Sequence, residues 1–173
     1  MDTTSFEAWV NQYRTRIYRA ACLLLDNPHD AEDITQQVFM EAWRGGSQFK
    51  GRSDPFTWLY TILRRACARH RRRHWWRIFG QQTESYETLL AQSPAITPAP
   101  CEESSLADDI RTVRLILREL STALREVLIL RYVEFYTVSE ISHLLKIPEG
   151  TVKSRIHYAL KVAAHHWPKE EKP

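Results

Sequence analysis

The stretch that decides the fold of the C-terminal half is Thr137-Val138-Ser139-Glu140-Ile141-Ser142-His143-Leu144-Leu145-Lys146-Ile147-Pro148-Glu149-Gly150-Thr151-Val152-Lys153-Ser154-Arg155. Its first four residues form a capping box, in which the Thr137 hydroxyl accepts from a backbone N–H and the Glu140 carboxylate reaches back. A short helix over 138–145 is expected after it. Lys146 to Gly150 then turns the chain into a long last helix. Two helices joined by a short turn predict a helix-turn-helix.

The last helix has an apolar stripe and a polar remainder. We expect the stripe to face inward; it consists of Val152, Ile156, Ala159, Leu160 and Ala163. The polar residues around it lie where a recognition helix enters the major groove of DNA; they are Thr151, Lys153, Ser154, Arg155, His157, Tyr158 and Lys161. Such a motif reads too few base pairs for stable binding by one monomer, so dimerisation or a second DNA contact is required.

The N-terminal half predicts three helices. Apolar residues recur at helical spacing between about Ser5 and Leu25. Asn27-Pro28 and Ser53-Asp54-Pro55 each combine a capping residue with a proline, which marks the start of a helix. The second helix should end at Gly45-Gly46 and bury Ala31, Ile34, Val38 and Ala42, whereas the third should bury Phe56, Leu59, Tyr60 and Leu63.

Two further helices are expected upstream of the helix-turn-helix. One should bury Leu106, Ile110, Val113, Leu117 and Leu120, and the other follows Ser121 with Leu124, Val127, Leu128 and Arg131. Because the alternating pattern of strands is absent, the predicted fold class is all-α, with two small helical domains and a C-terminal helix-turn-helix.

The net charge of +3 over 173 residues hides a strong segregation of charge. Residues 1–50 carry −2, residues 51–80 carry +7, residues 81–110 carry −6 and residues 111–173 carry +4. The acidic stretch also holds Pro94, Pro98 and Pro100, so we interpret residues 80–105 as a flexible linker. The expected domains are therefore residues 1–79 and residues 106–173.

An arginine-rich stretch closes the first domain. Residues 64–77 contain seven Arg and no Asp or Glu, which favours a polyanionic partner because like charges four residues apart on a helix repel. Nucleic acid fits this density better than a solvated helix end does. The neighbouring Trp75, Trp76 and Phe79 either stack on bases or pack against the protein core or a partner, and the sequence leaves both open.

The sequence contains no motif of an enzyme, a cofactor site, a metal site or a membrane-spanning segment. The five glycines form no phosphate-binding loop, and no catalytic triad is readable, so no enzymatic activity and no cofactor are expected. His70 and His74 are spaced for a metal but lie among arginines, and we predict no metal site. Three scattered cysteines suit a reducing cytosol, and no apolar run approaches the ~20 residues of a membrane helix, so a cytoplasmic location without membrane insertion is expected.

Several motifs, taken together and in order, resemble a known family. They are Asp30-Ala31-Glu32-Asp33-Ile34-Thr35-Gln36-Gln37-Val38-Phe39, Phe49-Lys50-Gly51, Trp58-Leu59-Tyr60-Thr61-Ile62 with the arginine-rich end, Val138-Ser139-Glu140-Ile141 and Ile147-Pro148-Glu149-Gly150-Thr151-Val152-Lys153-Ser154-Arg155. The chain resembles an extracytoplasmic-function (ECF) sigma factor of bacterial RNA polymerase over nearly its whole length.

The resemblance implies a role for each surface. The second helix would bind core RNA polymerase at the clamp of the beta-prime subunit, through Asp33, Gln36, Gln37, Phe39 and Glu41. The loop and third helix would read and melt the minus-10 element, through Arg52, Ser53, Trp58, Arg64, Arg65, Arg69 and Arg72. The last helix would read the minus-35 element, through Thr151, Lys153, Ser154, Arg155, His157 and Tyr158. Further implied partners are promoter DNA, the beta flap and an anti-sigma factor.

The chain departs from the family pattern at three positions. Arg65 and Arg69 stand where many members have Asn and Asp, and Tyr158 stands where Arg is frequent. These departures affect which promoter sequence is read. Two other functions stay open: a free-standing helix-turn-helix regulator that binds duplex DNA as a dimer, and an RNA-binding adaptor.

Overall fold

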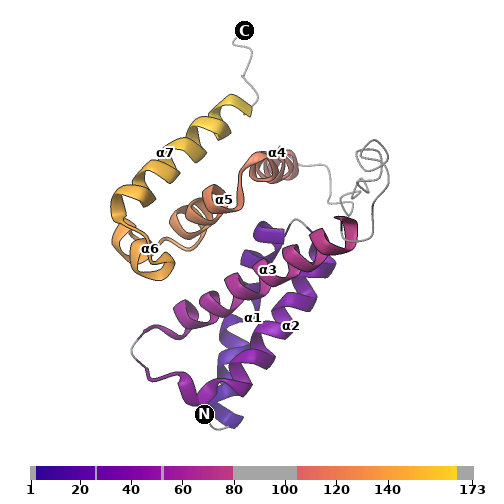
Figure 1. The fold of residues 1–173 in the computed structure, drawn as a ribbon, viewed down its shortest axis with the longest axis vertical. Coiled ribbons are helices and arrows are strands. Elements are labelled where there is room, and N and C mark those ends of the chain that lie inside the picture. Colours follow the sequence, from indigo (N-terminus) through magenta and orange to yellow (C-terminus); the bar gives the residue numbers. More distant parts are fainter. Residues whose placement is uncertain (1–2, 26, 52, 80–104, 167–173) are drawn as a thin grey trace. The chain divides into compact units, whose positions relative to one another are not determined.

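The computed structural model describes residues 3–25, 27–51, 53–79 and 105–166, and all its regular structure is helical there. It divides into two compact units, one built mainly from residues before position 102 and one mainly from residues after it (Figure 1). The all-α fold with two helical domains is thus confirmed. The predicted linker falls almost entirely outside the described residues.

The N-terminal unit consists of three helices joined by short connections. They are α1 (Thr3–Leu25), α2 (Pro28–Arg44) and α3 (Pro55–Phe79), with a 3₁₀ turn η1 (Gly46–Gln48) between the last two. Asn27 caps α2 as predicted, because its side-chain oxygen accepts from the His29 and Asp30 backbone N–H groups at 2.9 and 3.4 Å. Helices α2 and α3 lie against each other along their lengths.

Large aromatic and aliphatic side chains fill the core of this unit. Phe56, Leu59, Tyr60 and Leu63 of α3 are fully buried, as the sequence predicts. Aromatic contacts connect α1 to its neighbours: Phe6 meets Phe39 of α2 at 6.3 Å, and Tyr13 meets Phe56 at 6.3 Å between ring centroids. Burial raises the pKa of the Tyr13 phenol above its ordinary value. This core fixes the position of α3.

Gly45 ends α2 without the left-handed conformation that often follows a helix. Its φ is −93°, and its N–H donates to the carbonyl oxygens of Glu41 and Trp43. A Cβ atom at this position would lie 3.1 Å from the Glu41 carbonyl oxygen. Close approach to the preceding turn therefore explains why glycine suits this position.

The C-terminal unit contains α4 (Ser105–Glu119), α5 (Thr122–Leu128), α6 (Val138–Leu145) and α7 (Glu149–His166). A π-helical turn, η2 (Ile129–Val133), continues α5. Helix α7 packs against α4, α5 and α6. The core of the C-terminal unit includes Leu117, Leu120, Leu128 and Ala159.

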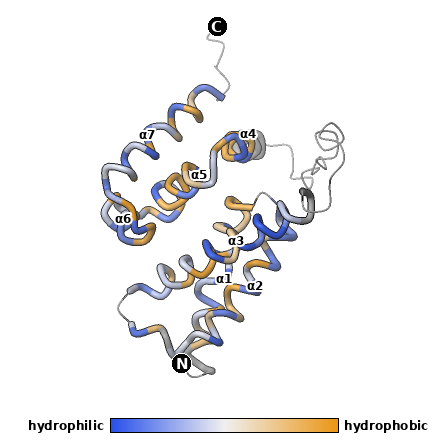
Figure 2. The backbone as a smooth tube through the Cα atoms, viewed as in Figure 1, coloured by the Kyte–Doolittle hydropathy of each residue, from blue (hydrophilic) through white to orange (hydrophobic). Residues whose placement is uncertain are grey.

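Two residues placed in inward stripes by the sequence point outward. Val113 and Leu160 are both exposed, whereas Ile116, one turn after Val113 on α4, is buried instead. Leu106 and Ile110 belong to a part of α4 whose side chains are not described. Figure 2 shows the resulting mixture of apolar and polar segments along each helix.

Candidate nucleic-acid interface

The loop before α3 rests on a small aromatic cluster. The Trp58 ring lies 5.3 Å from Phe49 and 6.1 Å from Trp9, measured between centroids. Trp58 is half-buried in this cluster, so part of its ring is available to a ligand. Ser53 is exposed, and the Asp54 carboxylate accepts from the Thr57 N–H at 3.3 Å, which caps α3. Arg52 lies outside the described residues.

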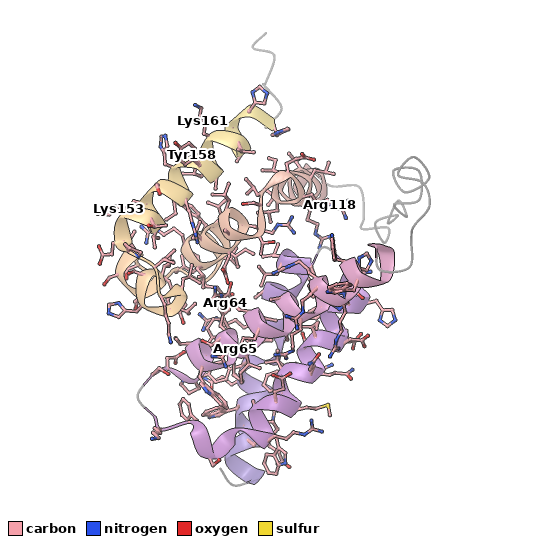
Figure 3. The ribbon with its side chains drawn as sticks, viewed as in Figure 1. Arg64, Arg65, Arg118, Lys153, Tyr158 and Lys161 are labelled. Carbon is pink, nitrogen blue, oxygen red and sulfur yellow. The ribbon has the colours of Figure 1, made fainter. Side chains whose placement is uncertain are left out.

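The basic half of α3 carries four of the predicted DNA-binding arginines. Arg65 and Arg72 are exposed, whereas Arg64 and Arg69 are half-buried. Figure 3 shows Arg64 and Arg65 next to each other on α3. The exposed guanidinium groups can bind phosphates, because arginine forms bidentate charge-assisted hydrogen bonds with them.

Arg69 is already engaged within the unit. Its guanidinium forms an ion pair with the Glu41 carboxylate of α2, and both side chains are about one-third exposed. The Gln37 side-chain amide donates to the same carboxylate at 2.8 Å. Arg69 and Glu41 were predicted to contact different ligands, DNA and polymerase, yet in this structure they bind each other. The pair fixes α3 against α2.

A second polar contact joins the same two helices. The Nε2 atom of His70 lies 3.3 Å from the Asp30 carboxylate, which is an ion pair when the imidazole is protonated. The part of the chain that the structure describes contains no group of three or more side chains able to hold a metal. His70 therefore serves helix packing here.

The outer face of α2 is more apolar than the sequence prediction assumed. Asp33 and Gln36 are exposed as expected, but Phe39 is only 8% exposed and packs in the core against Phe6. Phe39 was predicted to contact polymerase, and its burial leaves little of its ring for that contact. Met40 and Trp43 are exposed on this helix and were missed. Their three-residue spacing, off the buried stripe, is the signal that identifies them.

Hydrogen bonds hold the two helices of the helix-turn-helix in place. The predicted capping box is present: the Glu140 N–H donates to Thr137 Oγ1 at 3.2 Å, and the Thr137 N–H donates to Glu140 Oε2 at 2.7 Å. The Thr137 N–H and, next, the Thr137 hydroxyl donate to the Glu140 carboxylate, and these two bonds lower the pKa of that carboxyl. In the turn, Lys146 adopts a left-handed conformation with φ 56°, and the Ser142 hydroxyl donates to the Ile147 carbonyl at 2.7 Å. The Ser142 bond closes the turn between α6 and α7.

Helix α7 presents most of its predicted DNA-binding residues. Lys153, Ser154, His157 and Tyr158 are exposed, and Thr151 and Arg155 are half-buried. Figure 3 shows Lys153, Tyr158 and Lys161 following one another along the helix. The Ser154 hydroxyl donates to the Thr151 carbonyl at 3.0 Å, and the His157 and Tyr158 rings meet edge to face at 5.9 Å. One helix therefore offers cationic, hydroxyl and aromatic groups to a single ligand.

The turn between η2 and α6 contains a residue with positive φ that the sequence does not predict. Phe135 has a φ of 58° and is 83% exposed, an unusual conformation for a bulky residue. The Arg131 guanidinium donates to the Tyr136 carbonyl at 3.0 Å and helps to hold the turn. The sequence gives no signal for this conformation, because the segment Tyr132-Val133-Glu134-Phe135-Tyr136 contains no glycine.

None of the helices in the described ranges is long and apolar enough to cross a membrane.

Comparison with known proteins gives a consistent result for both units. Residues 9–77 match the family model of Sigma-70 region 2, and residues 116–162 match that of Sigma-70 region 4. The chain is 29% identical over 159 residues to the ECF RNA polymerase sigma factor SigW of Bacillus subtilis, which covers 90% of this chain and 85% of that protein. It is 30% identical over 164 residues to the RNA polymerase sigma-H factor of Pseudomonas aeruginosa, covering 91% and 83%.

A solved structure shares the fold. The sigma factor RpoE of Bartonella quintana, crystallised in complex with the anti-sigma factor NepR, superposes with a TM-score of 0.78 at 24% identity. The match covers 98% of this chain and 100% of that one.

Proposed function

The chain belongs to the extracytoplasmic-function sigma factors of bacterial RNA polymerase, and from that premise we propose which surfaces perform each part of its function. Sigma factors of this kind bind core polymerase and direct it to promoters, and this chain does so. The observation that best supports this function is the order of the two matched regions. Region 2 lies on the N-terminal helices and region 4 on the helix-turn-helix. The proposed domains are residues 1–79 and 106–173, joined by residues 80–105.

The minus-10 element is bound by the α3 side of the N-terminal unit. Ser53, the open part of Trp58 and the exposed Arg65 and Arg72 provide hydroxyl, aromatic and cationic groups along one helix and the loop before it. These groups suit a strand whose bases are unstacked, because bases stack on aromatic rings while arginines neutralise phosphates. Arg64 and Arg69 support this surface from half-buried positions, and Arg52 completes the proposed set.

The minus-35 element is bound by α7 in the major groove. The exposed His157 and Tyr158 follow the exposed Lys153 by four and five residues, so the three side chains span about one and a half turns. Thr151, Ser154 and Arg155 are the remaining proposed contacts. Tyr158, where Arg is frequent in the family, offers a hydroxyl and an apolar ring, which favours a different base from the guanine that arginine prefers.

Core polymerase is bound by the outer face of α2. The exposed Asp33 and Gln36 are joined by Met40 and Trp43, which together make an amphipathic surface. Trp43 is held by Phe6 at 5.0 Å, so its ring is presented in a defined position. Gln37 and Glu41 contribute through their network with Arg69. The beta-prime clamp is the proposed ligand of this face, and the beta flap that of the C-terminal unit.

An anti-sigma factor is the expected regulator, since a similar sigma factor was crystallised with one. The protein acts in the cytoplasm, where its polymerase and promoter are, and it has no catalytic activity of its own. A free-standing dimeric regulator is not favoured, because such a protein does not need a Sigma-70 region 2, and this chain has one.

Run-off transcription with core polymerase and a promoter library tests the proposal. We expect initiation at a defined set of promoters that share minus-10 and minus-35 sequences. Absence of specific initiation, together with tight binding of duplex operators by the isolated protein, would refute it in favour of the regulator.

A further inference from the structure

Two adjacent tryptophans near the end of α3 have no role in the function described so far. Trp75 is 53% and Trp76 is 61% exposed, which is unusual for residues that normally bury most of their large apolar surface. Their rings meet edge to face, with centroids 5.4 Å apart and planes at 87°. In such a pair one ring contributes its edge, so its flat faces are not covered by the other.

The helix periodicity places Trp76 on the same face as the proposed minus-10 contacts. Counted from Arg65, Arg72 lies seven residues further along the helix and Trp76 lies eleven. These separations are close to two and three turns of ~3.6 residues. All three side chains are exposed, and the exposed Ala68 between them is too short to obstruct a ligand. A continuous stripe therefore runs from Arg65 through Arg72 to Trp76.

The charge around the pair favours nucleic acid over a protein. Helix α3 contains no Asp or Glu from Pro55 to Phe79, and the exposed Arg72 and Arg73 precede the tryptophans within one turn. An apolar protein ligand would gain nothing from this density of positive charge, whereas DNA offers phosphates to the arginines and flat bases to the indoles.

We propose that Trp75 and Trp76 form a stacking platform for an unpaired base of promoter DNA, at the far end of the minus-10 surface. At ~1.5 Å per residue, Trp76 lies roughly 16 Å along the helix from Arg65, so the two side chains meet different nucleotides of the same strand. This inference rests on the proposed function of α3.

The experiment measures the affinity of the assembled holoenzyme, core polymerase with the full chain, for two DNA probes. One is a fully paired promoter fragment, and the other is the same fragment with mismatched, unpaired bases over the minus-10 element and five or six positions on each side. The variants are Trp76→Ala and Trp76→Phe. The control is Tyr132→Ala, since Tyr132 is also an exposed aromatic residue but belongs to the other unit. Alanine is the best helix former, so Trp76→Ala preserves α3.

We expect Trp76→Ala to weaken binding of the unpaired probe about tenfold and binding of the paired probe much less, as the loss of one base–aromatic stack predicts. Trp76→Phe keeps a flat ring and should retain most of the affinity. Because stacking releases no counterions, the salt dependence should be unchanged in Trp76→Ala, whereas Arg72→Ala should lower its slope by about one.

Three results would overturn the platform: equal affinity of Trp76→Ala and wild type for the unpaired probe, an equal loss on both probes, or a defect confined to assembly with core polymerase. The last would assign the tryptophans to a protein contact. Failure of the wild-type holoenzyme to initiate at any promoter would instead refute the proposed function.

Discussion

Helices α3 and α7 both face DNA in the proposed function, yet they are held in different ways. Helix α3 buries four large side chains completely, Phe56, Leu59, Tyr60 and Leu63, and is tied to α2 by the Arg69–Glu41 pair. Helix α7 has only Val152 and Ala159 among its buried residues, and it packs through them against its neighbours α4, α5 and α6. One helix is part of the core, and the other is presented by its neighbours.

The difference suits the two tasks. Holding unpaired bases requires side chains in fixed positions against strained DNA, which a helix anchored by large buried residues provides. Reading a groove requires a helix whose surface is mostly free, and small buried residues let α7 lie close to α5 while exposing the rest. The position of α3 is thus set by large buried side chains, and the position of α7 by small ones.

The largest expected effect comes from removing an anchor of α3. Phe56→Ala should lower the free energy of unfolding of the N-terminal unit by about 3–5 kcal/mol, because it leaves a cavity at a fully buried site. Urea unfolding followed by circular dichroism measures this loss. Thr57→Ala, at the next, half-buried position, is the control. A Phe56→Ala protein as stable as wild type would contradict the view that packing fixes α3.

The corresponding test in α7 enlarges a small residue instead. Ala159 is fully buried in the core of the C-terminal unit, so Ala159→Leu should overpack it and destabilise that unit by about 1–3 kcal/mol. The same unfolding measurement applies, together with transcription from a minus-35-dependent promoter, which should fall. Ala164→Leu, exposed on the same helix, should change neither. Tolerance of leucine at position 159 would show that α7 does not need close contact.

Much of this contrast could be predicted from the sequence. The caps at Asn27 and Thr137 and the buried stripes of α2 and α3 follow from local patterns of residue type and helical spacing, and the structure confirms them. Local patterns decide these features because they depend on residues within one or two turns.

What could not be predicted depends on contacts between distant residues. Glu41 and Arg69 are 28 positions apart, so their pairing requires α2 and α3 to be placed first. Leu160 fits an inward stripe by spacing, but the width of the buried face of α7 is set by its neighbours, and Leu160 is exposed. Phe135 with positive φ is fixed by the π-helical turn before it, which no local propensity indicates.

A change on the surface of α7 should affect reading without affecting stability. Lys153 is exposed, so Lys153→Ala should leave unfolding unchanged and reduce initiation at minus-35-dependent promoters by roughly tenfold, the value of one good base or phosphate contact. Arg155 is half-buried, so Arg155→Ala should also lower stability. Parallel transcription assays on promoters with and without the minus-35 element separate these cases. Equal loss on both promoters would refute the assignment of Lys153 to that element.

The smallest expected effect tests how much the charged cap of α6, the first helix of the helix-turn-helix, contributes to stability. The hydrogen bonds from Thr137 lower the pKa of Glu140 below its ordinary value of 4.5. A carboxyl whose pKa is lower when folded stabilises the folded state above the unfolded pKa, and this contribution is lost as pH falls from about 4.5 through the folded pKa. Wild type should therefore lose more stability than Glu140→Gln between about pH 6 and pH 3, a difference measurable by thermal melting. Ser139→Ala, exposed in the same first turn of α6 and without a titratable group, is the control and should lose stability in parallel with wild type. If Glu140→Gln and wild type lost stability in parallel, the charged cap of α6 would contribute nothing to the stability of the C-terminal unit.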